Sequence, residues 1–215
     1  MLFRSVSGGL RVLPDFTFAD APAPKIVVIP ALGEPTAAML HWIRRVSGST
    51  DITMSVCNGA FVLAATGLLD GKPATCHHGS FIRFAVTFPK VEPRPGARFV
   101  ESGNLATAGG VTAGIDLALH VVARYSGRAQ SQTLADIMEY QGQGWLNPDS
   151  NQAYAHPPTS TGEDLVCPLC GMAADKAIHS DHEGKTFYFC SEGEKAFFIA
   201  NPTAVKKFLG KKPAN

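Results

Sequence analysis

The chain has 215 residues, a formal net charge of +1, 45% hydrophobic residues and 17% charged residues. This balance excludes a nucleic-acid-binding field spread over the whole molecule, and the apolar fraction is too high for a disordered chain. No apolar run approaches the length of a membrane span, and the N-terminus lacks the uninterrupted apolar run of a signal peptide. We therefore expect a cytoplasmic protein of one or two domains that binds neither nucleic acid nor membrane.

The first half of the chain alternates between strand and helix patterns. The runs 25–30 and 51–56 are short, apolar and rich in β-branched residues, which predicts strands buried on both faces of a sheet. In the predicted helix 112–126, Ile115, Leu119 and Val122 share the apolar side. The remaining predicted strands are 72–76, 98–102 and 105–108, and the remaining helices are 35–46, 58–66 and 132–140. This order predicts an α/β fold, a parallel sheet with helices on both faces and sites at the carboxyl ends of its strands.

Cys57 lies where the strand 51–56 turns into the helix that follows it, in Ser55-Val-Cys57-Asn-Gly-Ala60. Gly59 allows the helix to pack closely behind the turn, and the helix N-terminus favours a thiolate. The pattern predicts a cysteine nucleophile on a sharp strand-to-helix turn. The alternative is a small apolar residue at a buried turn.

His77 follows the next predicted strand, in Thr75-Cys-His-His-Gly79. An imidazole beside Cys57 would be the general base that activates the thiol. The alternative is a loop histidine without a partner. We expect Cys76 to be a small packed side chain and His41 and His120 to be structural.

The segment 55–78 resembles the ThiJ/PfpI group of the class I glutamine amidotransferase-like superfamily, above all its isonitrile-hydratase-like and transcription-regulator branch. Matches to the same branch also occur at 10–22, 107–119 and 138–140. The resemblance covers about residues 7–145. It implies a flavodoxin-like sheet, Cys57 as nucleophile, His77 as its partner and a homodimer. Backbone N–H groups of the turn at Cys57 and Asn58 would hold developing negative charge.

Three departures from that family's pattern affect the expected site. The family has a strand and a helix before the position of Ser7, with a carboxylate at the end of that strand, and this chain has no counterpart. We therefore expect an N-terminally truncated family domain with exposed ladder edges or rearranged pairing, and no acidic partner for Cys57 from that strand. Asp116 and Glu101 are the nearest other carboxylates, although solvated surface roles are commoner. The further departures are Pro30-Ala-Leu-Gly33 in place of a Pro-Gly-Gly turn, Asn58 and Cys76 in place of threonines, and His78 in place of an aromatic.

A change of composition divides the chain into two domains. The stretch 147–163 is rich in Pro, Ser, Thr and Asn and predicts a linker between an N-terminal domain, 1–146, and a C-terminal module, 164–215. The module contains Cys167-Pro-Leu-Cys170-Gly-Met172, where two thiolates have the spacing that grips one metal from a tight turn. A strand is expected at 187–189 and helices at 195–199 and 202–209. A segment of ~50 residues rarely folds alone without such a staple.

The module resembles the YHS domain, a small treble-clef-like α+β fold, over about residues 164–209. The resemblance implies that Cys167, Cys170 and Cys190 bind zinc or another soft metal ion. Glu194 stands where that family often has a further cysteine and would complete the site through oxygen. His179, His182 or a water are the alternatives for that position, and a module that binds no metal is the alternative for the whole site. No cofactor is expected in the N-terminal domain.

Two functions remain open from the sequence. The first is a cysteine-dependent hydrolase or hydratase that acts on a small-molecule C–N electrophile, with Cys57 as nucleophile and His77 moving the proton. The second is a non-catalytic metal or oxidative-stress sensor, in which Cys57 is oxidised and the C-terminal cysteines hold metal.

Overall fold

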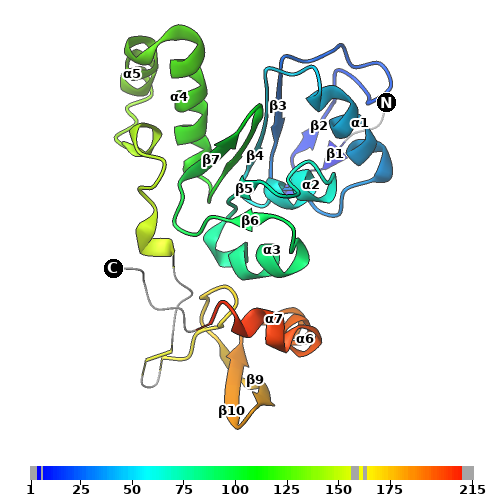
Figure 1. Cartoon of the computed structure of the whole chain (residues 1–215), viewed down its shortest axis with the longest axis vertical. Coiled ribbons are helices and arrows are strands. Elements are labelled where there is room, and N and C mark those ends of the chain that lie inside the picture. Colours follow the sequence, from blue (N-terminus) through cyan, green and yellow to red (C-terminus); the bar gives the residue numbers. More distant parts are fainter. Residues whose placement is uncertain (1–3, 6, 156–159, 162–163, 210–215) are drawn as a thin grey trace.

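The structure, a computed structural model, describes residues 4–5, 7–155, 160–161 and 164–209 (Figure 1). Its centre is a four-stranded sheet in the order β3-β4-β8-β7. Strands β3, β4 and β8 are parallel, and β7 is antiparallel to β8. The predicted parallel sheet is therefore confirmed, with one antiparallel edge added. The strands are β3 (Ile26–Ile29), β4 (Ile52–Val56), β7 (Phe99–Ser102) and β8 (Leu105–Ala108).

Helices cover both faces of this sheet, as the alternating pattern predicts. On one face, α1 (Ala37–Ser47) and α2 (Gly59–Ala65) close a core that includes Val27 and Ile29 of β3. On the other face, α4 (Ala113–Ser126) packs Leu117 and Val121 against β4, β7 and β8. Helix α5 (Arg128–Ile137) packs beside α4.

Two expectations about buried faces are wrong. Ile26 and Val28 are 43% and 50% exposed, because β3 is an edge strand in the described part of the chain and its second face is uncovered. In α4, Leu119 is buried as predicted, although against Ala135 of α5 and Trp145, whereas the row that packs with the sheet is Ala113, Leu117 and Val121, and Ile115 is 38% exposed. The reason is that the i, i+4 row facing the sheet is fixed by the position of the helix on the sheet, which hydrophobic spacing alone does not give.

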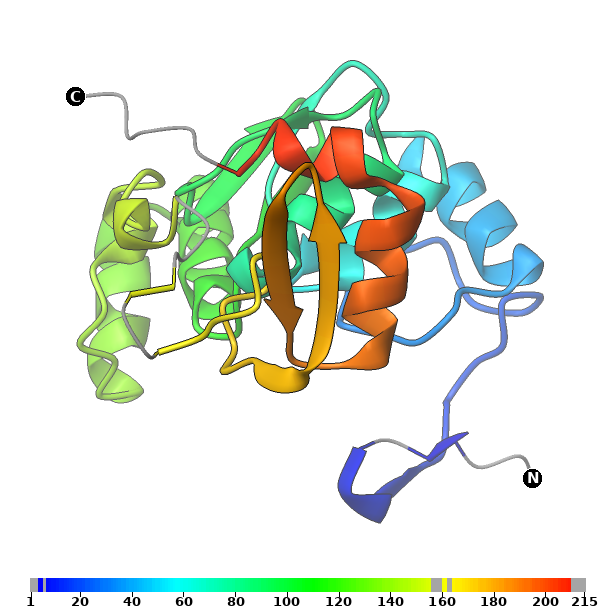
Figure 2. The same ribbon diagram turned by 90° about the horizontal axis from the view of Figure 1, so that it is seen from below.

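The N-terminal segment forms a hairpin outside the sheet. Strands β1 (Arg4–Ser5) and β2 (Arg11–Val12) pair only with each other. Figure 2 shows this hairpin standing apart from the body of the molecule. Because the hairpin does not extend the sheet, the ladder edge of β3 stays open among the described residues, in line with the exposed edge expected from the sequence.

Three short elements follow the sheet's second strand and helix. Strands β5 (Pro73–Ala74) and β6 (Glu92–Pro93) form a small parallel pair. Between them lies helix α3 (Phe81–Thr87), preceded by a 3₁₀ turn at His78–Ser80. Of these elements, only strand β5 was predicted from the sequence.

The C-terminal module consists of a β-hairpin and two helices. The hairpin joins β9 (Asp175–His182) to β10 (Lys185–Phe189), and the helices are α6 (Glu192–Ala200) and α7 (Pro202–Lys206). Strand β9 was not predicted from the sequence, whereas β10 and both helices were. Across the described ranges, no helix has the length and hydropathy needed to cross a membrane.

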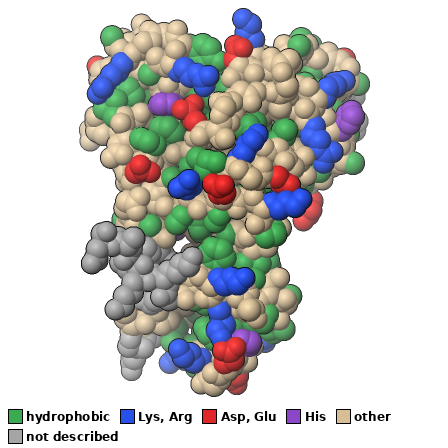
Figure 3. Space-filling view, viewed as in Figure 1, with side chains coloured by type: hydrophobic (Ala, Val, Ile, Leu, Met, Phe, Trp, Pro, Cys, Tyr) green, Lys and Arg blue, Asp and Glu red, His purple; other side chains and the backbone are tan. Residues whose placement is uncertain are grey.

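The segment expected to be a linker is packed against the sheet domain over its described first part. A 3₁₀ turn at Gly144–Leu146 precedes this segment, and a second one at Gln152–Tyr154 lies within it. The backbone N–H of Arg98 donates to Pro148 O at 2.5 Å, and that of Asn151 donates to Gly96 O at 3.2 Å. On the face shown in Figure 3, acidic and basic side chains are interspersed, without a continuous field of either sign.

Candidate active site and cysteine cluster

Cys57 occupies a strained turn between β4 and α2. Its φ is +58°, a left-handed conformation that is uncommon for a residue other than glycine. Gly59, two residues after Cys57, packs against the end of β3, since a Cβ on Gly59 would lie 2.1 Å from Ile29 O. Only glycine fits there, so the sharp strand-to-helix turn predicted from the sequence is confirmed.

The polar groups of the turn are used differently from what the sequence suggested. The backbone N–H of Cys57 donates to Ala108 O at 3.1 Å and Gly109 O at 3.0 Å, so it is not free to stabilise an oxyanion. Within the described part of the chain, the N–H of Asn58 donates to no backbone carbonyl. The Asn58 side-chain Oδ1 is buried and has no hydrogen-bond partner there. Asn58 therefore offers the turn's unused donor and acceptor.

His77 packs against the two glycines that follow strand β8, at positions 109–110. A Cβ on Gly110 would approach His77 Cδ2 to 2.7 Å, so the imidazole rests directly on that backbone. The neighbouring Gly109 carbonyl accepts the Cys57 N–H. Residues 109–110 thus touch both predicted catalytic residues, although no hydrogen bond joins Cys57 and His77 directly in the described structure. The Nδ1 atom of His77 accepts the backbone N–H of Gly79 at 3.1 Å.

Cys76 and His78 flank His77 in different environments. Cys76 is 2% exposed, and burial together with Cys57 raises the pKa of its thiol far above the usual range. This fits the packed side chain expected from the sequence. The His78 ring stacks on His77 at 4.5 Å and contacts Tyr154 at 4.6 Å. Burial and then the charge of His77 lower the pKa of His78.

The two alternative carboxylates have other partners. Asp116 is completely buried, with its Oδ2 2.5 Å from Arg98 Nε and accepting the Tyr140 hydroxyl at 3.1 Å. Glu101 pairs with His120 at 2.7 Å, and the structural role expected of His120 stays a prediction. The Arg98–Asp116–Tyr140 network was not predicted, because nothing in the spacing of these residues indicates that they meet.

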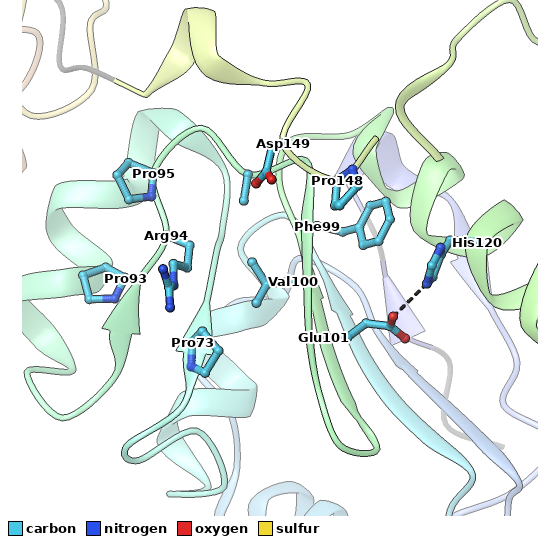
Figure 4. A pocket seen from close by; sticks show the side chains of 11 residues that line it. Pro73, Pro93, Arg94, Pro95, Phe99, Val100, Glu101, His120, Pro148 and Asp149 are labelled. Atoms are coloured by element: carbon cyan, nitrogen blue, oxygen red, sulfur yellow. Dashed lines mark hydrogen bonds and ion pairs between the residues drawn. The ribbon is translucent and has the colours of Figure 1, made fainter. Parts of the chain in front are cut away.

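A hollow of about 540 Å³ opens beside β7 (Figure 4), and neither Cys57 nor His77 lines it. The Glu101–His120 pair forms one side, and Arg94 faces it from the loop after β6. Four prolines, Phe99 and Val100 form most of its apolar wall: the prolines are Pro73, Pro93, Pro95 and Pro148. None of the residues that line it belongs to the predicted dyad.

The three C-terminal cysteines come together as the sequence predicts. The Sγ atoms of Cys167, Cys170 and Cys190 all lie within 4.8 Å of one another, and those of Cys170 and Cys190 are 3.4 Å apart. Gly171 has φ +78° and closes the turn, with its N–H donating to Cys167 O at 2.9 Å. Thiolates bound to one tetrahedral zinc at about 2.3 Å lie roughly 3.8 Å apart, so this donor set fits a soft metal.

The cluster already favours one thiolate. A hydrogen bond from the Cys170 thiol lowers the pKa of Cys167 to about 6 and raises that of Cys170. Burial raises the pKa of Cys190. Shared protons of this kind are what a bound metal displaces.

The structure does not place Glu194 in this cluster. Its Oε2 lies 3.0 Å from Arg83 Nη2, in an ion pair with helix α3. His182 faces Glu183, and His179 Nδ1 lies 3.2 Å from Lys176 O. Among the described residues, no further Cys, His, Asp or Glu side chain joins the three thiols. The fourth ligand expected from the sequence is therefore not found at Glu194.

Comparison with known proteins identifies the N-terminal part of the chain. The sequence model of the DJ-1/PfpI family matches residues 4–124, a span that contains both Cys57 and His77. The chain is 35% identical over 144 residues to isonitrile hydratase from Pseudomonas putida, covering 62% of this chain and 60% of that protein. It is 36% identical over 115 residues to the HTH-type transcriptional regulator GlxA from Rhizobium meliloti, covering 51% of this chain and 35% of the regulator.

A solved structure shows the same fold. A DJ-1 superfamily protein from Salmonella typhimurium superimposes with a TM-score of 0.55 at 23% identity, over 65% of this chain and 78% of that one. The sheet domain therefore has the flavodoxin-like α/β fold of this superfamily. The chain spans less than two thirds of the length of both curated relatives.

Proposed function

The chain belongs to the DJ-1/PfpI family, and from this premise we propose that it is a cysteine-dependent hydratase or hydrolase acting on a small C–N electrophile, such as an isonitrile or an amide. The observation that supports this most directly is the strained turn at Cys57, whose φ of +58° is held by the close packing of Gly59 on the end of β3. Strain of this kind concentrates at functional sites.

The proposed reaction begins with attack by the Cys57 sulfur. With an isonitrile, the S–C bond forms at the terminal carbon while the thiol proton, passed through His77, ends on that same carbon. Water then adds to the resulting thioimidate carbon, the S–C bond breaks, and the released thiolate recovers a proton. The net change is the addition of one water, giving a formamide.

Asn58 is the residue we propose for orienting the substrate at this turn. Its unpartnered Oδ1 accepts a substrate N–H or a water, and its backbone N–H faces the negative charge that develops during attack. The Cys57 N–H takes no part, because it already donates to the carbonyl oxygens of Ala108, the last residue of β8, and of Gly109.

We propose that the C-terminal module is a YHS-like domain and that Cys167, Cys170 and Cys190 hold one zinc or similar soft ion there. The donor set of three clustered sulfurs supports this assignment. When bound, the metal supplies a covalent staple for a small module rather than chemistry on the substrate. The homodimer implied by the resemblance stays a prediction.

A second function needs a test because the two candidate carboxylates in the described part of the chain, Asp116 and Glu101, are both paired elsewhere and so do not replace the carboxylate that the family has beside its cysteine. In that case the chain is a sensor, in which a peroxide oxidises the Cys57 thiolate to a sulfenic acid and is itself reduced to the alcohol or water. The metal site then has a structural or storage role.

One experiment separates the two functions. The full chain is incubated with a simple alkyl isonitrile, and formamide is measured by mass spectrometry beside Cys57→Ala, His77→Gln and the control Cys76→Ala. The enzyme hypothesis predicts formamide formation that falls about 10³-fold in Cys57→Ala, about 10²-fold or more in His77→Gln, and little in the control. Absence of turnover on isonitrile and amide, with stoichiometric oxidation of Cys57 by peroxide, would instead establish the sensor.

A further inference from the structure

Helix α3 belongs to the cores of both domains. Phe81 and Phe84 of α3, and Phe88 just after it, are spaced by three and four residues and pack in the core of the sheet domain. The rings of Phe84 and Phe88 contact Phe61 of α2. Ile82 and Val86, offset by one position, pack with Cys167, Phe189 and Phe198 of the module. Two stripes on one short helix therefore join the domains, and Figure 1 shows α3 lying between the sheet and helices α6 and α7.

Arg83 strengthens the same junction. Its guanidinium pairs with Glu194 at 3.0 Å and lies 4.2 Å above the ring of Phe197. The Arg83 and Glu194 side chains are 35% and 20% exposed, so this pair is partly shielded from solvent. The module thus makes a defined contact with the segment that begins at His77 and runs into α3.

Gly79 is the residue at which this contact reaches the predicted active site. A Cβ built on Gly79 would lie 3.3 Å from the carbonyl oxygen of Cys170 and 3.2 Å from His77 Nδ1. The Gly79 N–H donates to that same Nδ1. The backbone of a metal-ligand candidate, a glycine and the imidazole are therefore packed in series.

This hydrogen bond decides which nitrogen of His77 carries a proton. Because Nδ1 accepts, the neutral ring must carry its hydrogen on Nε2. An Nε2–H donates to a thiolate or to a substrate atom, whereas a proton taken up from the thiol makes the ring doubly protonated and so breaks the Gly79 bond, because Nδ1 then carries a hydrogen. The ring is further confined by Gly110 on one side and by the stacked His78.

We infer that Gly79 is a positioning residue through which the metal-loaded cysteine cluster holds His77 as its Nε2–H tautomer, so that metal occupancy sets the reactivity of Cys57. This inference rests on the proposed roles of the Cys57–His77 pair and of the cysteine cluster. Metal binding fixes the Cys170 backbone, that backbone confines Gly79, and Gly79 presents its N–H to Nδ1. Without metal the Gly79 contact loosens and both tautomers are populated, so the ring no longer holds an Nε2–H ready for the proposed interaction with the Cys57 thiolate.

The test uses the full chain, kept reduced, either loaded with one equivalent of Zn²⁺ or stripped with a chelator. Imidazole ¹H–¹⁵N spectra, assigned with His77→Gln, report the tautomer of His77, with His120 as a reference ring remote from the cluster. We expect a single Nε2–H form of His77 with zinc, a mixture without it, and no change at His120. Alkylation of Cys57 by iodoacetamide, followed on its own peptide, should be about five- to ten-fold faster with zinc, since a hydrogen bond to a charged group is at stake.

Two variants keep the inference open to refutation. Gly79→Ala should retain its zinc and still show the mixed tautomer, because the added Cβ displaces the Cys170 carbonyl or the ring. Arg83→Met should also retain zinc and show both tautomers of His77. The control Arg94→Met, which removes an exposed arginine 3.9 Å from Glu92, should give the same His77 spectrum and Cys57 alkylation rate as the parent.

The outcomes separate the inference from its premises. Zinc that binds without changing His77 or the Cys57 rate overturns the coupling alone. Equal changes at His77 and His120 overturn it as well, because they would show a general stabilisation. A chain that takes up no zinc refutes the proposed metal site, and the coupling falls with it.

Discussion

Arg98 and Asp116 form an ion pair whose carboxylate is completely removed from solvent, with 2.5 Å between Nε and Oδ2. The pair joins the residue just before β7 to the first turn of α4, and Arg98 also donates to Thr112 Oγ1 and Pro148 O. Asp116 Oδ1 has no partner among the described residues, so this network is satisfied on one side only. A buried charge of this kind depends strongly on its partner.

Replacing Asp116 by Asn should therefore destabilise the chain by about 3 kcal/mol, because the Arg98 charge is left without its counter-ion in a shielded position. Urea unfolding measures the change. Asp136→Asn is the matched control, since Asp136 accepts only an exposed hydrogen bond from Gln132. Zinc content and Cys57 labelling should stay at parent values in folded Asp116→Asn. A loss of Cys57 reactivity in this variant would show that Asp116 contributes to the active site.

Gly59→Ala should disrupt the turn that carries Cys57. Its Cβ would lie 2.1 Å from Ile29 O and 2.7 Å from Pro30 O, and neither backbone atom can yield cheaply. We expect a loss of about 3 kcal/mol or more in the free energy of unfolding. Gly48→Ala, at an open helix end with nothing within 4 Å, should change stability by less than about 1 kcal/mol. Equal effects of the two substitutions would contradict the close packing.

Thiol reactivity should follow the environments of the cysteines. In the zinc-loaded chain at neutral pH, Cys57 should be alkylated fastest and Cys76 slowest, because Cys76 is buried and its pKa is strongly raised. Brief exposure to iodoacetamide followed by peptide mass spectrometry ranks the sites. Preferential labelling of Cys76 would show that the turn does not present Cys57 to solvent.

Zinc content should depend on the three cysteines and not on Glu194. Protein purified without chelator should carry about one zinc per chain, and Cys190→Ser should lose it. Glu194→Gln should keep its zinc, because the carboxylate is engaged by Arg83. Elemental analysis decides the matter, and a Glu194→Gln chain devoid of zinc would restore glutamate as the fourth ligand.

His78 should titrate at lower pH than an ordinary histidine. Burial, and then the charge of His77, lower its pKa from the usual 6.5, so at pH 6.5 less than half of the His78 rings should be protonated. NMR titration of the ring measures the midpoint. Tyr154→Ala removes a ring packed 4.6 Å away and should move the midpoint up towards 6.5, and an unchanged midpoint would argue against burial by Tyr154.

Local pattern was enough to predict the parts of the site that depend on neighbours in sequence. Cys57 follows a buried strand and precedes Gly59, so the turn and its strain are encoded within a few residues. The same holds for Cys167 and Cys170, whose tight turn needs only Gly171. The strands of the sheet and helices α1, α2 and α4 were predicted for the same reason, because hydrophobic spacing within a short window indicates the type of element, although not which of its faces is buried.

The sequence by itself determined that this chain has a cysteine turn on an α/β sheet and a separate pair of thiols that a third cysteine could join. Only the tertiary structure decided which groups meet: that Glu194 pairs with Arg83, that Asp116 pairs with Arg98, and that Gly79 lies between Cys170 and His77. The contacts Arg98–Asp116, Gly79–Cys170 and Arg83–Glu194 join residues 18, 91 and 111 positions apart. They arise because α3 and α4 each present two faces to different neighbours, and the choice of neighbour depends on how whole elements pack rather than on the spacing within any one of them.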